Sequence, residues 1–263
     1  GDQSALNLTE TTQPVLLTSS VALWRAWLSQ GGPAPVVMAG HSLGEFSALV
    51  CAGALDFADA VQLVRQRGAF MQSAVPVGEG AMAAIIGVDD DVIVGVCTEV
   101  SAGEYGLVAA VNFNSPGQVV IAGHAAAVER AISALKDAGA KRAMPLPVSA
   151  PFHTELMKPA GEKLAQAIAD MKIDAPAVPV IHNVHAQSES DPEKIRALLV
   201  EQISSPVQWT RCVQGIADAG AGSVIECGPG KVLSGLNRRI DRSLQSYALE
   251  DPDALMATLA ALQ

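Results

Sequence analysis

The sequence predicts an α/β fold, in which a large domain with a mostly parallel sheet carries a small inserted subdomain. Short apolar runs alternate with helical patterns along most of the 263 residues, as expected for a parallel sheet covered by helices. Between residues 78 and 147 the order changes to strand-helix-strand-strand-helix-strand, the split motif of a ferredoxin-like subdomain. We therefore expect the large domain at 1–77 and 148–263 and the small subdomain at 78–147.

The individual elements follow from hydrophobic periodicity and from turn residues. For the large domain they are helices at 15–30, 57–74, 192–204, 207–219 and 231–240, and strands at 35–39, 178–181 and 223–226. For the small subdomain they are strands at 81–86, 107–113, 118–122 and 141–146, and helices at 89–101 and 125–138. Asp56 has the position of an N-cap for the helix at 57–74.

The composition limits the class of function. Hydrophobic residues make up 49% of the chain and charged residues 17%, which is enough for a substantial core. A formal net charge of −10 argues against a nucleic-acid surface, because phosphate binding needs a basic field. The four cysteines form no CxxC pair, and no apolar run is long enough to span a membrane. We expect a cytoplasmic monomer without a signal peptide, metal or other cofactor, which binds neither nucleic acid nor a membrane.

A candidate nucleophile follows the predicted strand at 35–39. The segment Gly40-His41-Ser42-Leu43-Gly44 fits G-x-S-x-G between a strand and a helix, the context of a nucleophile elbow. Such a turn exposes the Ser42 hydroxyl, and the N–H of Leu43 would point at a developing oxyanion. The two glycines would let strand and helix pack closely. A nucleophile elbow at this position would make the large domain hydrolase-like. The alternative is that the segment is an ordinary turn between a strand and a helix.

Five histidines could supply the base that a nucleophilic serine needs. His41 adjoins the serine, but the sharp turn is expected to aim its side chain elsewhere. His124 is expected to cap a helix or to lie exposed, and the pair His182 and His185 has no third metal ligand in view. His153 lies in an irregular stretch between the two domains, where catalytic groups are common. Its position alone leaves a catalytic and a structural role equally open.

One arginine lies on an unexpected side of its predicted helix. At 100° per residue, the apolar stripe of the helix at 57–74 includes Arg67 but not Arg65. An inward guanidinium needs a partner, and a carboxylate bound through two hydrogen bonds suits it best. The sequence leaves two partners equally open, a carboxylate of the protein and a carboxylate of the substrate.

Five spaced motifs recur together in one known family. In chain order they are Gly40-His41-Ser42-Leu43-Gly44-Glu45, Gln66-Arg67-Gly68, Asn112-Phe113-Asn114-Ser115-Pro116-Gly117-Gln118, the segment 149–153, and Glu226-Cys227-Gly228-Pro229-Gly230. With them, essentially the whole chain resembles the bacterial malonyl-CoA:acyl-carrier-protein transacylases of type II fatty acid synthesis. The resemblance implies transfer of malonyl from malonyl-CoA to the phosphopantetheine thiol of acyl carrier protein, through a malonyl-serine intermediate.

The resemblance also implies roles for single residues. Ser42 would be the nucleophile and His153 its base, oriented by the main-chain carbonyl of Gln202. Arg67 would bind the free carboxylate of the malonyl group. Because an acetyl group would leave that charge unpaired, the arginine would also select against it.

Further positions are implied for the cleft and for the partner protein. Asn112, Asn114 and Gln118 would line the cleft between the subdomains, and Phe152 resembles the Phe-His pairing of malonyl-selective acyltransferases. An acidic carrier protein would need a basic patch, for which 141–142 and 238–239 are candidates, although each pair could equally be an ordinary solvated surface.

The sequence departs from the family pattern at its start. The family opens with a strand that ends in a Gly-Gln-Gly-x-Gln segment, whose second glutamine supplies another oxyanion donor. The chain begins at a point some way into that pattern, so this N-terminal segment is missing. Either the sequence covers the family pattern incompletely, which we expect, or the protein has lost half of its oxyanion hole.

Two other functions compete with the transferase. A serine hydrolase would usually carry its catalytic histidine late in the chain, whereas no histidine follows His185, and the ferredoxin-like insert suits that fold poorly. A binding module that docks carrier proteins without turnover has the missing N-terminal segment as its only support.

Overall fold

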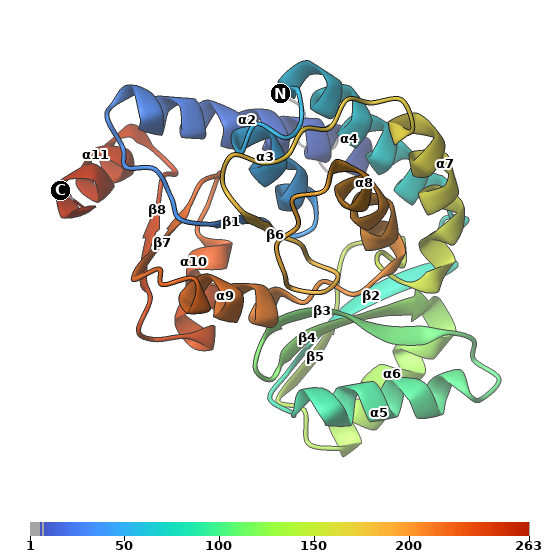
Figure 1. Cartoon of the computed structure of the whole chain (residues 1–263). Coiled ribbons are helices and arrows are strands. Elements are labelled where there is room, and N and C mark those ends of the chain that lie inside the picture. Colours follow the sequence, from blue (N-terminus) through green and yellow to red (C-terminus); the bar gives the residue numbers. More distant parts are fainter. Residues whose placement is uncertain (1–5, 7, 263) are drawn as a thin grey trace.

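The fold is mixed α/β, in a computed structural model that describes residue 6 and residues 8–262 (Figure 1). The first elements are α2 (Thr9–Ser29), β1 (Met38–Ala39), α3 (Leu43–Cys51) and α4 (Phe57–Ser73). They are followed by β2 (Gly80–Ile86), α5 (Asp90–Ser101), β3 (Val108–Ser115), β4 (Gln118–His124), α6 (Ala125–Asp137) and β5 (Arg142–Pro145). The last are η1 (Glu155–Met157), α7 (Lys158–Ile168), β6 (Val180–Ile181), α8 (Pro192–Glu201), η2 (Gln202–Ser204), α9 (Trp209–Asp218), β7 (Ser223–Glu226), α10 (Val232–Ile240), β8 (Gln245–Ala248) and α11 (Pro252–Leu262).

Two pairs of parallel strands form the sheet structure of the larger part. β1 pairs with β6, with Met38 opposite Val180, and β7 pairs with β8, with Ser223 opposite Gln245. A cavity of about 730 Å³ borders both pairs, because its lining includes residues of β1 and of β7. The parallel pairing of both pairs confirms the mostly parallel sheet that the sequence predicts for the large domain.

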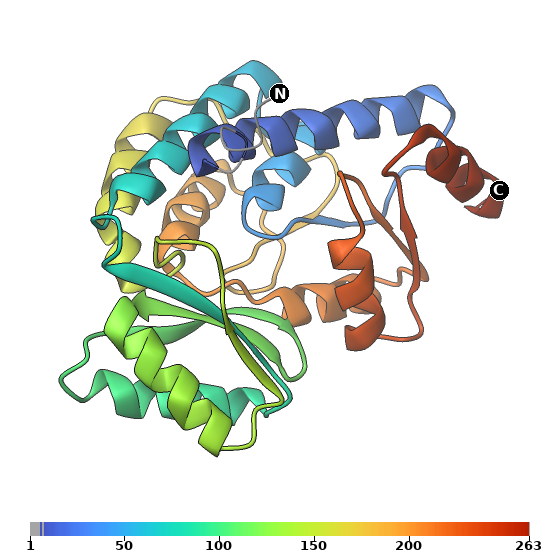
Figure 2. The same cartoon turned by 180° about the vertical axis from the view of Figure 1, so that it is seen from behind.

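The central four strands form an antiparallel sheet in the order β3-β4-β2-β5. Helices α5 and α6 cover the face that is turned away from the rest of the molecule (Figures 1 and 2). Because side chains alternate along a strand, Ile85 and Ile121 pack against these helices, whereas Met82 and Val120 pack on the opposite face with Phe152. Both faces of this sheet are thus buried.

Backbone hydrogen bonds connect the antiparallel sheet to the segment before α9. The N–H of Phe113 donates to the carbonyl of Val207 (3.0 Å), and the N–H of Val207 donates to the carbonyl of Val111 (2.8 Å). The hydroxyl of Thr210 donates to the carbonyl of Phe113 (3.0 Å). These bonds fix β3 against the larger part.

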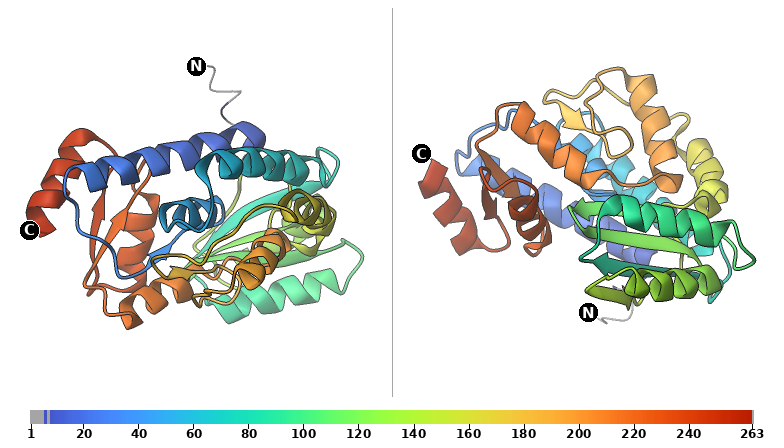
Figure 3. Two further views of the ribbon diagram at one scale, coloured as in Figure 1. Left: turned by 45° about the horizontal axis from the view of Figure 1, so that its top comes forward. Right: turned by 90° about the horizontal axis from the view of Figure 1, so that it is seen from below.

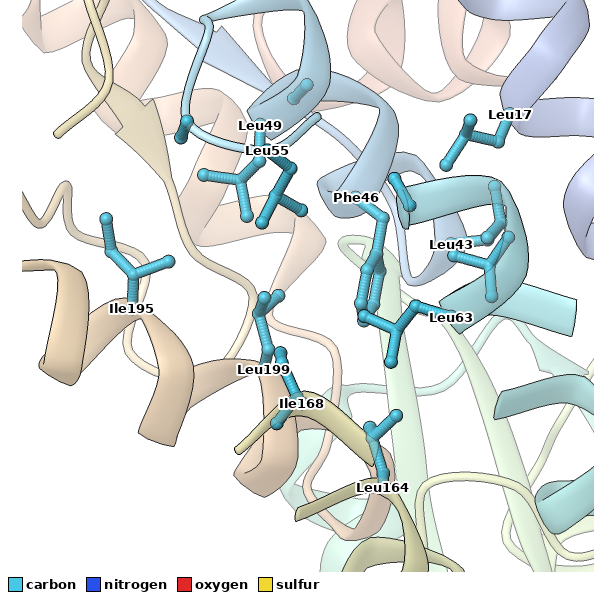
Figure 4. Close-up of a cluster of buried hydrophobic side chains, with 14 of the residues drawn as sticks. Leu17, Leu43, Phe46, Leu49, Leu55, Leu63, Leu164, Ile168, Ile195 and Leu199 are labelled. Carbon is cyan, nitrogen blue, oxygen red and sulfur yellow. The ribbon is translucent and has the colours of Figure 1, made fainter. Parts of the chain in front are cut away.

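The main hydrophobic core surrounds α3, whose Phe46 and Leu49 are fully buried (Figure 4). Leu17 of α2, Leu63 of α4 and Leu164 of α7 pack in the same cluster. α2 runs along one side of the molecule from α4 to α11 (Figure 3), and the end of α2 packs there through Trp27. The helix that starts at the candidate nucleophile is therefore held from several sides.

One predicted helix start agrees with the structure and another does not. Asp56 caps α4 as predicted, since its carboxylate accepts hydrogen bonds from the N–H groups of Ala58 (2.8 Å) and Asp59 (3.1 Å). The helix predicted at 15–30 begins earlier, at Thr9, and contains Pro14. Its first turn packs on α4 at Gly68, where a Cβ would lie 2.6 Å from the carbonyl oxygen of Thr9. Tertiary packing therefore extends the helix past the proline.

After the antiparallel sheet, the chain contains three elements that the sequence patterns did not predict. These are α7, β8 and α11. No helix in the part of the chain that the structure describes combines the length and the apolar character needed to cross a membrane.

The link between β1 and α3 predicts a difference between its two glycines. A Cβ on Gly40 would lie 1.9 Å from the carbonyl carbon of Gly44, whereas a Cβ on Gly44 would meet no atom within 4 Å. We expect Gly40→Ala to lower the free energy of unfolding by about 2 kcal/mol or more, because backbone atoms must move. Gly44→Ala should leave it unchanged or raise it by up to about 1 kcal/mol, because alanine favours the helix.

Chemical denaturation of both variants measures these changes. Equal changes in the free energy of unfolding for the two variants would contradict the prediction.

Candidate active site

Ser42 forms a strained turn between β1 and α3. Its φ is 52° and its ψ is −106°, a left-handed conformation that non-glycine residues rarely adopt. Two side chains hold the turn: Oδ1 of Asn183 accepts the N–H of Ser42 (2.7 Å), and Nε2 of Gln202 donates to its carbonyl (2.9 Å). Asn183 also donates to the carbonyl of Gly40 (2.7 Å). The turn thus has the strand–turn–helix context of a nucleophile elbow.

The Ser42 hydroxyl lies next to His153. Its Oγ is 2.9 Å from Nε2 of the histidine, and Nδ1 donates to the main-chain carbonyl of Gln202 (2.9 Å). Because Nδ1 carries the proton in this hydrogen bond, Nε2 has a free lone pair that can accept the serine proton. His153 also has a positive φ, 63°, so both members of the pair have strained backbones.

The surroundings of His153 favour the neutral imidazole. Burial lowers its pKa to about 3, and the nearby Arg67 cation adds to this, while the hydrogen bond to the Gln202 carbonyl acts in the opposite direction. A neutral imidazole is the form that can act as a general base. Nε2 of His153 is therefore unprotonated over the neutral and mildly acidic range.

Arg67 reaches the same point from α4. Its Nη1 donates to Oε1 of Gln13 (2.7 Å), and its Nη2 donates to Oε1 of Gln202 (2.8 Å) and to Oγ of Ser42 (3.1 Å). Burial lowers the pKa of the guanidinium to about 10, and the charge of Glu45 raises it again, so the group remains a cation near neutral pH.

No carboxylate of the described residues forms a salt bridge with this guanidinium, so the internal ion pair left open by the sequence is not formed there. The Nε atom of Arg67 is buried and has no partner among the described residues. A buried cation with free N–H groups beside a nucleophile can bind an anionic group of a substrate.

Four residues behind the elbow form a buried hydrogen-bond network. The carboxylate of Glu45 accepts hydrogen bonds from Nδ1 of His182 (2.6 Å), from the N–H of Asn183 (2.9 Å) and from Nε2 of Gln202 (2.9 Å). His182 therefore pairs with a carboxylate, and the described residues contain no cluster of three or more His, Cys, Asp or Glu residues suited to a metal ion. Glu45, Asn183 and Gln13 were not predicted as site residues.

Three further residues predicted for the site pair with residues other than Ser42. Oδ1 of Asn114 accepts a hydrogen bond from Nε2 of His41 (2.8 Å), whose ring is tilted against that of Trp209. Oε1 of Gln118 accepts an exposed hydrogen bond from Nη1 of Arg239 (2.7 Å). Asn112 pairs with Val207 through a β-bridge.

Two further predicted residues belong to the surroundings of Ser42 and His153, one through its backbone N–H and the other through its packing. Leu43 starts α3, so its N–H is one of the helical donors that have no partner within the helix. Phe152 packs on the inner face of the antiparallel sheet, next to the histidine that follows it in the chain. The 730 Å³ cavity borders Gly40, His41 and Leu43, but its lining includes neither Ser42 nor His153.

The sequence matches the family described as "Acyl transferase domain" over residues 1–254. It is 58% identical over 259 residues to the malonyl CoA-acyl carrier protein transacylase of Escherichia coli strain K12, covering 98% of this chain and 83% of that protein. It is 47% identical over 263 residues to the protein of the same name from Bacillus subtilis strain 168, covering 100% of this chain and 82% of that one.

Solved structures agree with these sequence matches. The solved structure of the malonyl CoA-acyl carrier protein transacylase from Coxiella burnetii superimposes with a TM-score of 0.97 at 47% identity, covering 100% of this chain and 82% of that one. A type II PKS acyl-carrier protein in complex with its malonyl-transacylase also superimposes with a TM-score of 0.97, at 52% identity, covering 99% of this chain and 84% of that one. The chain therefore belongs to the acyl transferase domain family and, within it, to the malonyl CoA-acyl carrier protein transacylases.

Proposed function

We propose that the chain transfers malonyl from malonyl-CoA to the phosphopantetheine thiol of acyl carrier protein, through an ester on Ser42, in fatty acid biosynthesis. The observation that carries this proposal is the convergence on Ser42 Oγ of a neutral histidine at 2.9 Å and an arginine cation at 3.1 Å. The first supplies a base for the hydroxyl, and the second supplies a partner for a carboxylate close to the new ester. The names of the relatives support the same substrate and the same acceptor.

In the first half-reaction, Nε2 of His153 takes the proton of Ser42 as Oγ attacks the thioester carbonyl. The negative charge that develops on the carbonyl oxygen is stabilised by the N–H of Leu43 at the start of α3. When the tetrahedral intermediate collapses, the C–S bond breaks, and the imidazolium returns its proton to the sulfur of coenzyme A. The malonyl group remains as an ester on Ser42.

Arg67 binds the malonyl carboxylate in the substrate and in the acyl-enzyme. To do so, the guanidinium exchanges its hydrogen bond to the Ser42 hydroxyl for hydrogen bonds to the carboxylate. Gln13 and Gln202 hold the guanidinium from behind through neutral amide oxygens, which support its position without neutralising its charge. An acetyl group offers no anion, so its binding would leave the buried cation without this partner.

The second half-reaction is the reverse of the first with a different thiol. His153 takes the proton of the phosphopantetheine thiol, the sulfur attacks the ester carbonyl, and Ser42 leaves with the proton returned. Water competes with the thiol at this stage. A protein that releases malonate to water alone would be a hydrolase rather than a transferase.

The organisation of the chain follows the same proposal. Separate hydrophobic cores support a large domain at 1–77 and 148–263 and a small subdomain at 78–147. The strand order β3-β4-β2-β5, with two helices on one face, supports a ferredoxin-like subdomain inserted into a hydrolase-like domain. We place Asn112, Asn114, Gln118 and Phe152 on the cleft between them, and we expect a cytoplasmic monomer that needs no cofactor.

The acyl-enzyme provides the direct test of this function. Incubation with malonyl-CoA should add one malonyl group to the protein, detectable by intact mass, and Ser42→Ala should abolish the adduct. Acyl carrier protein should discharge the adduct faster than water does. Discharge at the same rate with and without the carrier would contradict the transferase.

The charge of Arg67 predicts a shift in the acid limit of the reaction. Acylation by the uncharged ester p-nitrophenyl acetate requires neutral His153. Because the pKa of this histidine is about 3, the acylation rate should not change between neutral and mildly acidic pH. Arg67→Met removes a cation that lowers this pKa. The pKa should rise toward the ordinary value of 6.5, and the acid limb of the pH–rate profile should move to higher pH.

The matched control is Arg65→Met, which removes an exposed arginine from the same helix. Rates are compared over the pH range in which circular dichroism shows each variant folded. An acid limb at the same pH in the Arg67 variant and in the control would contradict the predicted coupling.

A further inference from the structure

The carboxylate of Glu45 is fully buried behind the nucleophile elbow. It lies on the first turn of α3, and both Glu45 and its partner His182 have no exposed side-chain surface. Its two oxygens accept three hydrogen bonds, from His182, the Asn183 backbone and Gln202. This satisfies the group well, but the proposed reaction assigns no task to it.

The contact with Gln202 determines the orientation of that amide. A carboxylate oxygen only accepts hydrogen bonds, so the NH₂ end of Gln202 must face Glu45 (2.9 Å). The amide oxygen therefore faces the other way, where it accepts a hydrogen bond from Nη2 of Arg67 (2.8 Å). The amide thus lies between an anion and a cation and presents the matching end to each.

This arrangement separates two charges that would otherwise pair directly. A salt bridge between Glu45 and Arg67 would occupy the paired N–H groups of the guanidinium and neutralise it. A buried guanidinium with no counter-charge would be costly to hold in the site. With the amide between them, the carboxylate lowers that cost while N–H groups of the arginine remain free.

We propose that Glu45 is a positioning residue for carboxylate recognition, which acts through the Gln202 amide to hold Arg67 in place without pairing with it. The proposal rests on the transferase function and extends it, because it explains how a buried cation stays available for the acyl carboxylate. The network also supports the elbow itself, because Asn183 accepts a hydrogen bond from the N–H of Ser42 and Nε2 of Gln202 donates to the Ser42 carbonyl.

Two acyl donors separate this effect from a general loss of structure. Malonyl-CoA carries the carboxylate that Arg67 binds, whereas p-nitrophenyl acetate acylates the same serine without one. Acylation by malonyl-CoA is followed by rapid quench and intact mass, and acylation by the ester is followed by the burst of nitrophenolate. The proteins are wild type, Glu45→Gln, Arg67→Met and the double variant, with Ser42→Ala as the blank.

Glu45→Gln keeps the shape of the side chain but lets the Gln202 amide turn in either direction. We expect malonyl acylation to fall on the order of tenfold, as for loss of a hydrogen bond to a charged group, and ester acylation to fall less than about threefold. In the Arg67→Met background, the same substitution should change malonyl acylation less than about threefold, because the two residues act as one unit. Glu201→Gln, which removes an exposed carboxylate beside Gln202, should leave both rates unchanged.

Equal losses with both donors, or an undiminished effect in the Arg67→Met background, would overturn the role of Glu45 while leaving the transferase intact. Failure of the wild-type protein to form a malonyl adduct would overturn the proposed function and this inference with it.

A second variant covers the case in which Glu45→Gln does not fold. Gln202→Met removes both ends of the amide, including the donor to the Ser42 carbonyl, but retains the main-chain carbonyl that holds His153. It should again slow malonyl acylation more than ester acylation. Equal losses with the two donors would again count against the proposal.

Discussion

The hydrogen bond from the N–H of Ser42 to the side chain of Asn183 is the contact on which the site depends. A serine in a left-handed conformation costs on the order of 1–3 kcal/mol, so the turn persists only if the surrounding structure holds it. Asn183 does this from one side, and the Gln202 amide does it from the other. Both residues come from the last third of the chain. The nucleophile is therefore positioned by tertiary structure rather than by its own motif.

These contacts between distant parts of the chain also explain which parts of the site could be predicted from the sequence. The spacing around Ser42 is local, and so is the helical phase that turned Arg67 inward. For His153, the sequence predicted only an irregular segment between the two domains, because its contact with Ser42 joins residues 111 positions apart. Gln13, Glu45 and Asn183 carry no such local signal, since each acquires its position only when separate elements pack together.

The fold was predictable to a similar degree and for similar reasons. The alternation of strands and helices and the cap at Asp56 depend on neighbouring residues, and these features agree with the structure. The start of α2 does not, because its packing at Gly68 outweighs the effect of Pro14 on the helix. The short strands of the larger part are only two to four residues long, so their patterns are weak.

The backbone bonds between β3 and Val207 have a consequence for how a substrate is received. They connect the antiparallel sheet to the segment before α9, so a rotation of one part against the other would break these hydrogen bonds rather than bend a free linker. The antiparallel sheet and the segment before α9 are therefore held in a fixed relative position before any ligand binds. Where two parts of a protein are already fixed against each other, little of a ligand's binding energy has to be spent on bringing them together.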